Sequence, residues 1–151
     1  MAKNPSGWET QLIDLAKKVY LPSIRVSLFV VYFWFGILKV IGTSPANPLV
    51  NDLLHRTIPF LSFEQFIIGF SIFEMIIGLL FLLAKFDRLA LVLVFIHIIL
   101  TAGPLVLLPE VTWQSMMTPT LEGQYIIKNL LIIAGAITIA AHLKPRLNHS
   151  A

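Results

Sequence analysis

The sequence predicts an all-α integral membrane protein, a four-helix bundle formed as one domain by residues 1–151. Two observations predict this class. The chain is 57% hydrophobic and only 13% charged, which lies far outside the composition of a soluble domain. Four apolar segments approach the ~20 residues that a helix needs to cross the hydrocarbon core. These predicted spans are residues 24–42, 63–84, 89–108 and 124–141.

Residues 1–20 lack a short apolar core followed by a small-residue cleavage site, so they do not resemble a signal peptide. Apolar residues recur there at helical spacing against acidic and basic residues, which predicts an amphipathic helix at the membrane interface. The apolar positions are Trp8, Leu12, Leu15, Ala16, Val19 and Tyr20. We expect this segment to anchor the protein.

The connections between spans differ in length. Three prolines interrupt residues 43–62, which predicts a short helix over about 49–57 at the outer end of the bundle. The sequence KFDR at residues 85–88 predicts a tight turn, so the second and third spans should be antiparallel neighbours. Residues 109–123 form a second outer segment, and Pro145 stops the last helix.

Lysine and arginine are distributed unequally between the two sides of the membrane. With the N-terminus inside, eight of the eleven lie at the cytoplasmic ends of the spans. They are Lys3, Lys17, Lys18, Arg25, Lys85, Arg88, Lys144 and Arg146. The asymmetry predicts that both termini are cytoplasmic. It also accounts for the net charge of +3, and no basic patch interleaved with aromatic residues indicates a nucleic-acid partner.

Glu74 is the most informative residue, because no other charge occurs in residues 66–84 around it. A carboxylate at the centre of a spanning helix costs about 3 kcal/mol to insert, so we expect it to face a polar interior. Helical spacing places the polar or small residues of each span on one face. The four predicted stripes are Arg25, Tyr32, Gly36 and Lys39; Ser71, Glu74 and Gly78; His97, Thr101 and Pro104; and Gln124, Lys128, Gly135 and His142.

The depth of these residues predicts a candidate site. Glu74 lies roughly 15 Å and His97 roughly 12 Å from the cytoplasmic ends of their spans, so they meet near the midplane if their helices face each other. We expect this pair to exchange protons. Lys39 and Lys128 lie about 5 Å from the outer ends, where they would bind an anionic or carbonyl-bearing head. Tyr32, Ser71 and Thr101 complete the candidate ligand-binding set.

Structural alternatives remain for each residue. Lys39 and Lys128 can extend to the headgroups, and His97 can be a neutral, hydrogen-bonded core residue. Glu74 can be protonated, or paired with Lys128 or His97, merely to hold the bundle together. The absence of cysteine excludes an iron–sulfur cluster carried by this chain. Glu74 is the only acid away from the ends of the predicted spans, so no metal site of paired carboxylates is expected. Haem ligation is disfavoured, since His97 and His142 lie at different levels.

Five segments resemble a known pattern, in order along most of the chain. They are IRVSLFVVYFWFGILKVIG at 24–42, GFSIFEMIIGLLFLL at 69–83, FDRLALVL at 86–93, PLVLLPE at 104–110 and EGQYIIKNLLIIAGA at 122–136. The chain resembles the DoxX-like superfamily of small four-helix bacterial inner-membrane proteins, in the branch with the YkgB-type reactive-chlorine-resistance proteins. The resemblance adds weight to Arg25, Lys39, Gly42, Glu74, Gly78, Arg88, Lys128 and Asn129. His97 belongs to no pattern of the family.

The resemblance implies a bacterial inner-membrane location and membrane redox chemistry, because members are tied to thiosulfate:quinone oxidoreduction, oxidative-stress defence and membrane redox complexes. We therefore expect a redox- or stress-associated subunit that binds a quinone-like molecule, whose polar head contacts Lys39, Lys128 and Asn129. The expected partners are the lipid bilayer, a redox subunit and further copies of the chain. A noncatalytic scaffold or assembly subunit is the alternative, and a small-solute or proton pathway is another.

Overall fold

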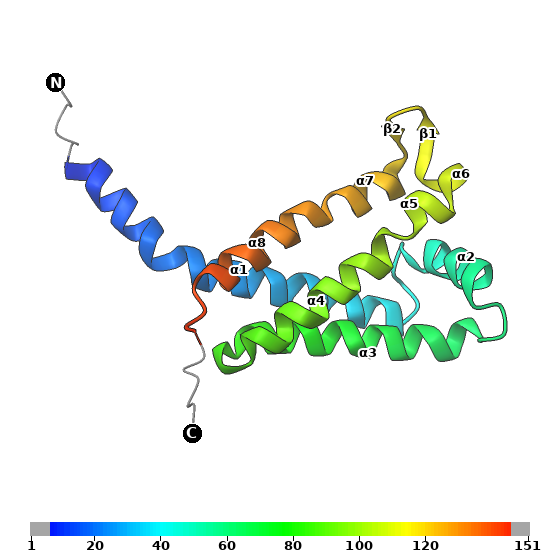
Figure 1. Cartoon of the computed structure of the whole chain (residues 1–151), viewed down its shortest axis with the longest axis horizontal. Coiled ribbons are helices and arrows are strands. Elements are labelled where there is room, and N and C mark those ends of the chain that lie inside the picture. The colour runs from blue at the N-terminus through cyan, green and yellow to red at the C-terminus, as the bar shows by residue number, and fades with distance from the viewer. Residues whose placement is uncertain (1–6, 146–151) are drawn as a thin grey trace.

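A computed structural model describes residues 7–145 of the chain. Four helical segments in this part are long and apolar enough to cross a membrane, which is typical of a multi-pass membrane protein. They are Gly7–Val40, Phe63–Leu82, Ala84–Leu107 and Leu121–Ala141. The predicted all-α class and the four apolar spans are therefore found in the structure (Figure 1).

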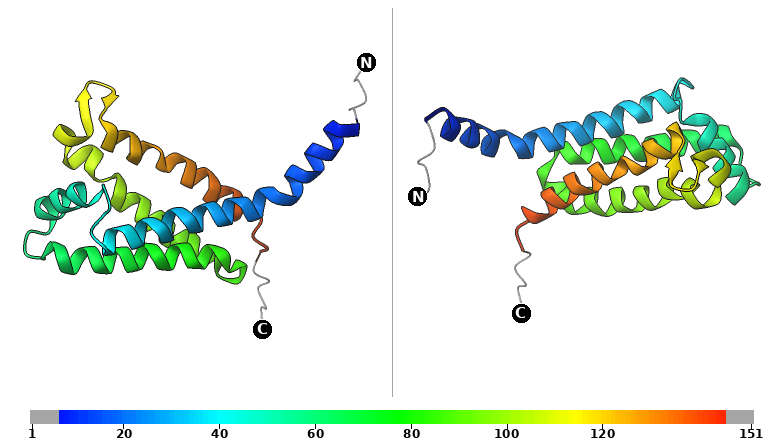
Figure 2. Two further views of the ribbon diagram at one scale, coloured as in Figure 1. Left: turned by 180° about the vertical axis from the view of Figure 1, so that it is seen from behind. Right: turned by 90° about the horizontal axis from the view of Figure 1, so that it is seen from above.

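The first helix, α1 (Gly7–Val40), is continuous over 34 residues. The segment predicted as a separate interfacial helix is therefore the N-terminal part of α1, and residues 7–20 are exposed. This part projects beyond the other helices, and α1 bends where it leaves them (Figure 2). Pro22 lies inside the helix and has no backbone N–H, which commonly bends a helix without ending it.

The connection after α1 contains α2 (Asn47–Thr57), with Pro48 in its first turn. Ser62 caps α3 (Phe63–Leu82) by accepting a hydrogen bond from the backbone N–H of Gln65. A short 3₁₀ turn, η1 (Ala84–Phe86), then leads directly into α4 (Asp87–Ala102), so α3 and α4 are antiparallel neighbours.

The second long connection has more structure than the sequence predicts. It contains two single-turn helices, α5 (Pro104–Leu107) and α6 (Pro109–Thr112), and a hairpin of β1 (Trp113–Ser115) and β2 (Thr118–Pro119). Met117 has a φ of 61° in the turn, where glycine or asparagine is usual, so the sequence carries no ordinary hairpin signal. The chain then forms α7 (Leu121–Ile127) and α8 (Asn129–Ala141), which are interrupted at Lys128.

The long helices form a ring in which α1 contacts α3, α3 contacts α4, α4 contacts α8, and α8 returns to α1. The contact between α1 and α3 is the most extensive. A Cβ atom at Gly78 would lie 3.0 Å from the backbone nitrogen of Phe33, and one at Gly36 would lie 3.0 Å from the carbonyl oxygen of Ser71. These glycines allow the two backbones to approach closely, as small residues do in membrane helix pairs.

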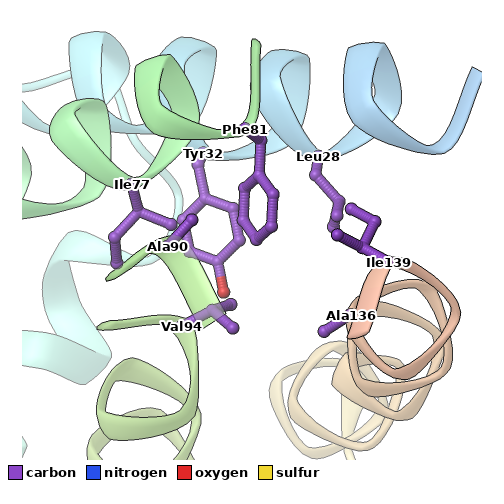
Figure 3. Close-up of a cluster of buried hydrophobic side chains, with 8 residues drawn as sticks. All are labelled: Leu28, Tyr32, Ile77, Phe81, Ala90, Val94, Ala136 and Ile139. Carbon is purple, nitrogen blue, oxygen red and sulfur yellow. The ribbon is translucent and has the colours of Figure 1, made fainter. Parts of the chain in front are cut away.

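Each of the four long helical segments contributes two side chains to the buried apolar cluster (Figure 3). The cluster consists of Leu28, Tyr32, Ile77, Phe81, Ala90, Val94, Ala136 and Ile139. Large apolar residues also cover the outside of the bundle, including Trp34, Phe95 and Leu131, which are 61%, 66% and 76% exposed. An outer surface of this kind suits contact with lipid.

Candidate functional site

Four side chains from three helices form a buried hydrogen-bonded chain, here called the Glu74 network. Lys39 of α1 donates from Nζ to both carboxylate oxygens of Glu74 on α3, over 2.8 and 2.6 Å. His97 of α4 lies 2.8 Å from Glu74 Oε1 through its Nε2 atom. Its Nδ1 atom lies 3.3 Å from the hydroxyl oxygen of Tyr32. The structure therefore brings together Glu74 and His97, which the sequence placed at similar depths.

The network lies in the interior of the bundle. Lys39, Glu74 and His97 are only 7%, 4% and 6% exposed, and Tyr32 is 2% exposed. A buried charge is costly unless it is paired, and here the ammonium of Lys39 and the carboxylate of Glu74 compensate each other. Both oxygens of Glu74 have partners, so the network satisfies its central carboxylate without an added group.

Lys39 lies deeper than the sequence predicts. It is in the last turn of α1, and the prediction placed its ammonium in a layer above Glu74. Side chains of a helix are tilted toward its N-terminus, so Lys39 points back into the bundle and reaches the level of the carboxylate. Its Nζ atom also lies 5.8 Å from the centre of the Phe70 ring.

Aromatic rings surround His97. Phe70 stacks on its imidazole with 5.5 Å between ring centres, and Tyr32 meets it edge-on at 4.9 Å. A neutral His97 that donates from Nε2 to Glu74 accepts at Nδ1 from the Tyr32 hydroxyl. A second proton at Nδ1 would make both ring nitrogens donors, and the Tyr32 hydroxyl would then have to accept, so the protonation of the imidazole is coupled to its hydrogen bonds.

Three other predicted ligand-binding residues lie near the network without joining it. Ser71 is fully buried, but its hydroxyl donates to the carbonyl oxygen of Ile67 one turn earlier on α3. Thr101 donates to the carbonyl oxygen of His97 over 2.9 Å. Asn129 donates from Nδ2 to the Thr101 hydroxyl over a long 3.4 Å contact, which joins α8 to α4. Thr101 and Asn129 are both half-buried.

Lys128 lies outside the network. The sequence predicts that Gln124, Lys128, Gly135 and His142 share an inward stripe, but only Gly135 faces α1, with Ile24 as its nearest neighbour. Lys128 is exposed, and its ammonium lies 4.8 Å from the centre of the Tyr125 ring. The interruption between α7 and α8 falls at this residue, so the 3.6-residue period does not continue across it. His142 is also exposed and pairs with the hydroxyl of Tyr20.

A second buried ion pair, here called the Arg25 pair, joins α1 to the start of α4. Arg25 donates to both carboxylate oxygens of Asp87 over 2.5 and 2.6 Å, and to the carbonyl oxygen of Phe81 over 3.1 Å. From its position in the sequence, Arg25 is expected to be a topology signal, and Asp87 is expected only to form part of a tight turn. The available signal was an acidic residue at the first position of a helix, opposite the inward face of α1.

Within residues 7–145, no group of three or more His, Cys, Asp or Glu side chains is placed to hold a metal ion. Comparison with protein-family models, with curated proteins and with solved structures found no match to this chain.

Proposed function

We propose that this protein is a redox-associated membrane subunit in which the Glu74 network exchanges protons with a quinone-like molecule from the bilayer. The observation that carries the proposal is the unbroken contact from Lys39 through Glu74 and His97 to Tyr32. Reduction of a quinone to a quinol consumes two electrons and two protons. A partner subunit supplies the electrons, and His97 with Glu74 supplies and recovers protons.

The polar head of the ligand binds beside His97, at the contact between Thr101 and Asn129. These residues are half-buried, whereas the Glu74 network is enclosed, so they are the more accessible polar groups near the imidazole. Their 3.4 Å hydrogen bond is weak, and a ligand carbonyl can replace it by accepting from Asn129. Lys39 acts indirectly, because its ammonium pairs with the Glu74 carboxylate and fixes its position beside His97. Lys128 has no role in this arrangement.

The proposed setting follows the DoxX-like resemblance and the distribution of charge. The protein is a bacterial inner-membrane protein with both termini in the cytoplasm, and the exposed N-terminal part of α1 lies at the cytoplasmic interface. The redox partner contacts the bundle from the membrane or from its surface. Further copies of the chain are the other neighbours in this proposed complex.

The test removes the ionisable groups of Lys39 and Glu74 together, so that neither charge is left buried without its partner. The double variant Lys39→Met with Glu74→Gln replaces the ion pair by neutral groups of similar size, so the bundle should remain folded. We expect it to lose quinone-dependent redox activity and the protection that the protein gives cells against oxidants. The matched control is Arg25→Met with Asp87→Asn, which neutralises the other pair and should retain activity. Full activity in the first double variant would refute the proposal.

A noncatalytic scaffold is the second candidate, and one observation favours it. Both oxygens of Glu74 are already bonded, and these bonds tie α1, α3 and α4 together without any ligand. In this case the network determines only how the helices pack. The scaffold predicts that both double variants support assembly equally well, and that mass spectrometry finds no quinone retained by the purified protein.

A further inference from the structure

A polar hollow of about 600 Å³ lies between α2 and the first turn of α3, beside the loop that follows α1. The polar side chains that line it are Ser44, Asn47, Asn51, His55, Ser62 and Glu64. Asn47, Asn51 and His55 are spaced four residues apart, so they lie on one face of α2. A short helix that packs on a longer one usually turns an apolar face toward it. The face of α2 that borders this hollow instead carries two amides and an imidazole.

Two of the side chains that line this hollow offer hydrogen-bond acceptors. The side-chain oxygen Oδ1 of Asn47 is buried, and it is the one such side-chain atom among the described residues without a hydrogen-bond partner. His55 Nδ1 lies 2.8 Å from the carbonyl oxygen of Asn51. Because a carbonyl only accepts, Nδ1 carries the proton, and Nε2 of the neutral ring is an acceptor.

The charge of the hollow is negative. Glu64 is exposed, and within residues 7–145 it takes part in none of the ion pairs. The nearest basic residue on α2 is Arg56, whose guanidinium pairs with Glu110 across the end of the bundle. The Glu64 carboxylate, the Asn47 side-chain oxygen and the His55 Nε2 atom therefore lie around one hollow. Among the described residues, no positively charged side chain pairs with any of these three atoms or groups.

We propose that this hollow binds a primary ammonium group, carried by a phospholipid headgroup or by a free amine. A primary ammonium has three N–H donors and one positive charge, which match the acceptors of Asn47 and His55 and the charge of Glu64. The hollow lies at the ends of the apolar parts of α1 and α3, where the headgroup layer of a bilayer begins. This site is separate from the Glu74 network and does not depend on its function.

The test compares two lipids that differ only at the headgroup nitrogen. The full-length protein is placed in nanodiscs with equal amounts of phosphatidylethanolamine and phosphatidylcholine, and native mass spectrometry measures which lipid it retains. Phosphatidylcholine has no N–H donor, so we expect phosphatidylethanolamine to be retained about tenfold more. Glu64→Gln and Asn47→Leu should each abolish this preference. Glu122→Gln, an exposed acid at the start of α7, should keep it.

A second measurement distinguishes a lipid from a free amine. In nanodiscs of phosphatidylcholine alone, free ethanolamine should raise the melting temperature of the wild type and not that of Glu64→Gln. If ethanolamine acts in this way but phosphatidylethanolamine is not enriched, the ligand is a free amine. Asn47→Asp keeps the acceptor and adds a charge, so it should bind either amine more tightly, a gain that misfolding cannot imitate. Absence of both responses in the wild type, or unchanged responses in Glu64→Gln and Asn47→Leu, would overturn the proposal.

Discussion

The two ion pairs of α1 resemble each other in form and differ in what surrounds them. Lys39 pairs with Glu74 and Arg25 pairs with Asp87, and every one of these side chains is at most 15% exposed. Fourteen residues separate the two basic residues, which corresponds to about 21 Å along the helix. Leu28 and Tyr32, two members of the apolar cluster drawn in Figure 3, lie between them along α1.

The Arg25 pair is complete in itself, whereas the pair of Lys39 and Glu74 continues into a third ionisable group. Arginine does not lose its proton, and the Asp87 carboxylate is further stabilised by the N-terminus of α4. Glu74 instead contacts His97, whose imidazole has two ring nitrogens and also contacts Tyr32. The Arg25 pair therefore has contacts that join helices, whereas the histidine beside the other pair is what the proposed proton exchange requires.

The largest effect on stability is expected when Lys39 is removed alone. Lys39→Met leaves the Glu74 carboxylate buried without its cation, which should destabilise the protein by about 3 kcal/mol. The loss is at the lower end of the usual range because His97 still bonds to Glu74. Unfolding in detergent measures it, and adding Glu74→Gln to the variant should recover most of the loss. Equal stability of the single and double variants would show that the charges are not coupled.

A smaller effect is expected at the Arg25 pair. Arg25→Met should cost about 2 kcal/mol, because Asp87 retains the stabilisation of the α4 N-terminus and lies closer to solvent. The same unfolding measurement checks it, with Lys17→Met as the control for an exposed pair. If Arg25→Met proves more damaging than Lys39→Met, the ranking of the two pairs is wrong.

The pair of Lys39 and Glu74 depends on the close approach of α1 and α3, which Gly78→Ala tests. The new methyl group would press against backbone atoms of Phe29 and Phe33, at 3.1 and 3.0 Å, so we expect a loss of about 1–3 kcal/mol. Gly69→Ala on the same helix is the matched control, since a Cβ atom there meets nothing within 4 Å. It should leave stability unchanged or raise it slightly.

Tyr32→Phe should have the smallest effect on stability, below about 1 kcal/mol, since its hydrogen bond to His97 is 3.3 Å long. This variant nevertheless separates a functional role of the hydroxyl from a packing role best, because the ring stays and only the hydroxyl is removed. If the network relays protons, this variant should lose redox activity while it unfolds like the wild type. Tyr125→Phe, at an exposed position, is the control. Retained activity in Tyr32→Phe would remove the hydroxyl from the relay.

Local regularities account for what the sequence predicts correctly. The second predicted span, for example, begins at Phe63 as α3 does and ends two residues later, whereas the first covers only part of the longer α1. Uninterrupted helical spacing also places Tyr32, Glu74 and His97 on inward faces. The prediction is wrong at Lys128, where the helix is interrupted, and it misses the hairpin at Met117, whose turn lacks the usual residues.

Taken alone, the sequence determines that four apolar helices enclose an acid whose burial in lipid would be too costly. Only the tertiary structure decides which cation compensates that acid. Lys39 and Lys128 have the same charge and similar predicted depth, but one points back along an unbroken helix toward Glu74 and the other projects outward from a break. Charge pairing over less than 3 Å depends on helix rotation and side-chain direction, which spacing along the chain does not specify.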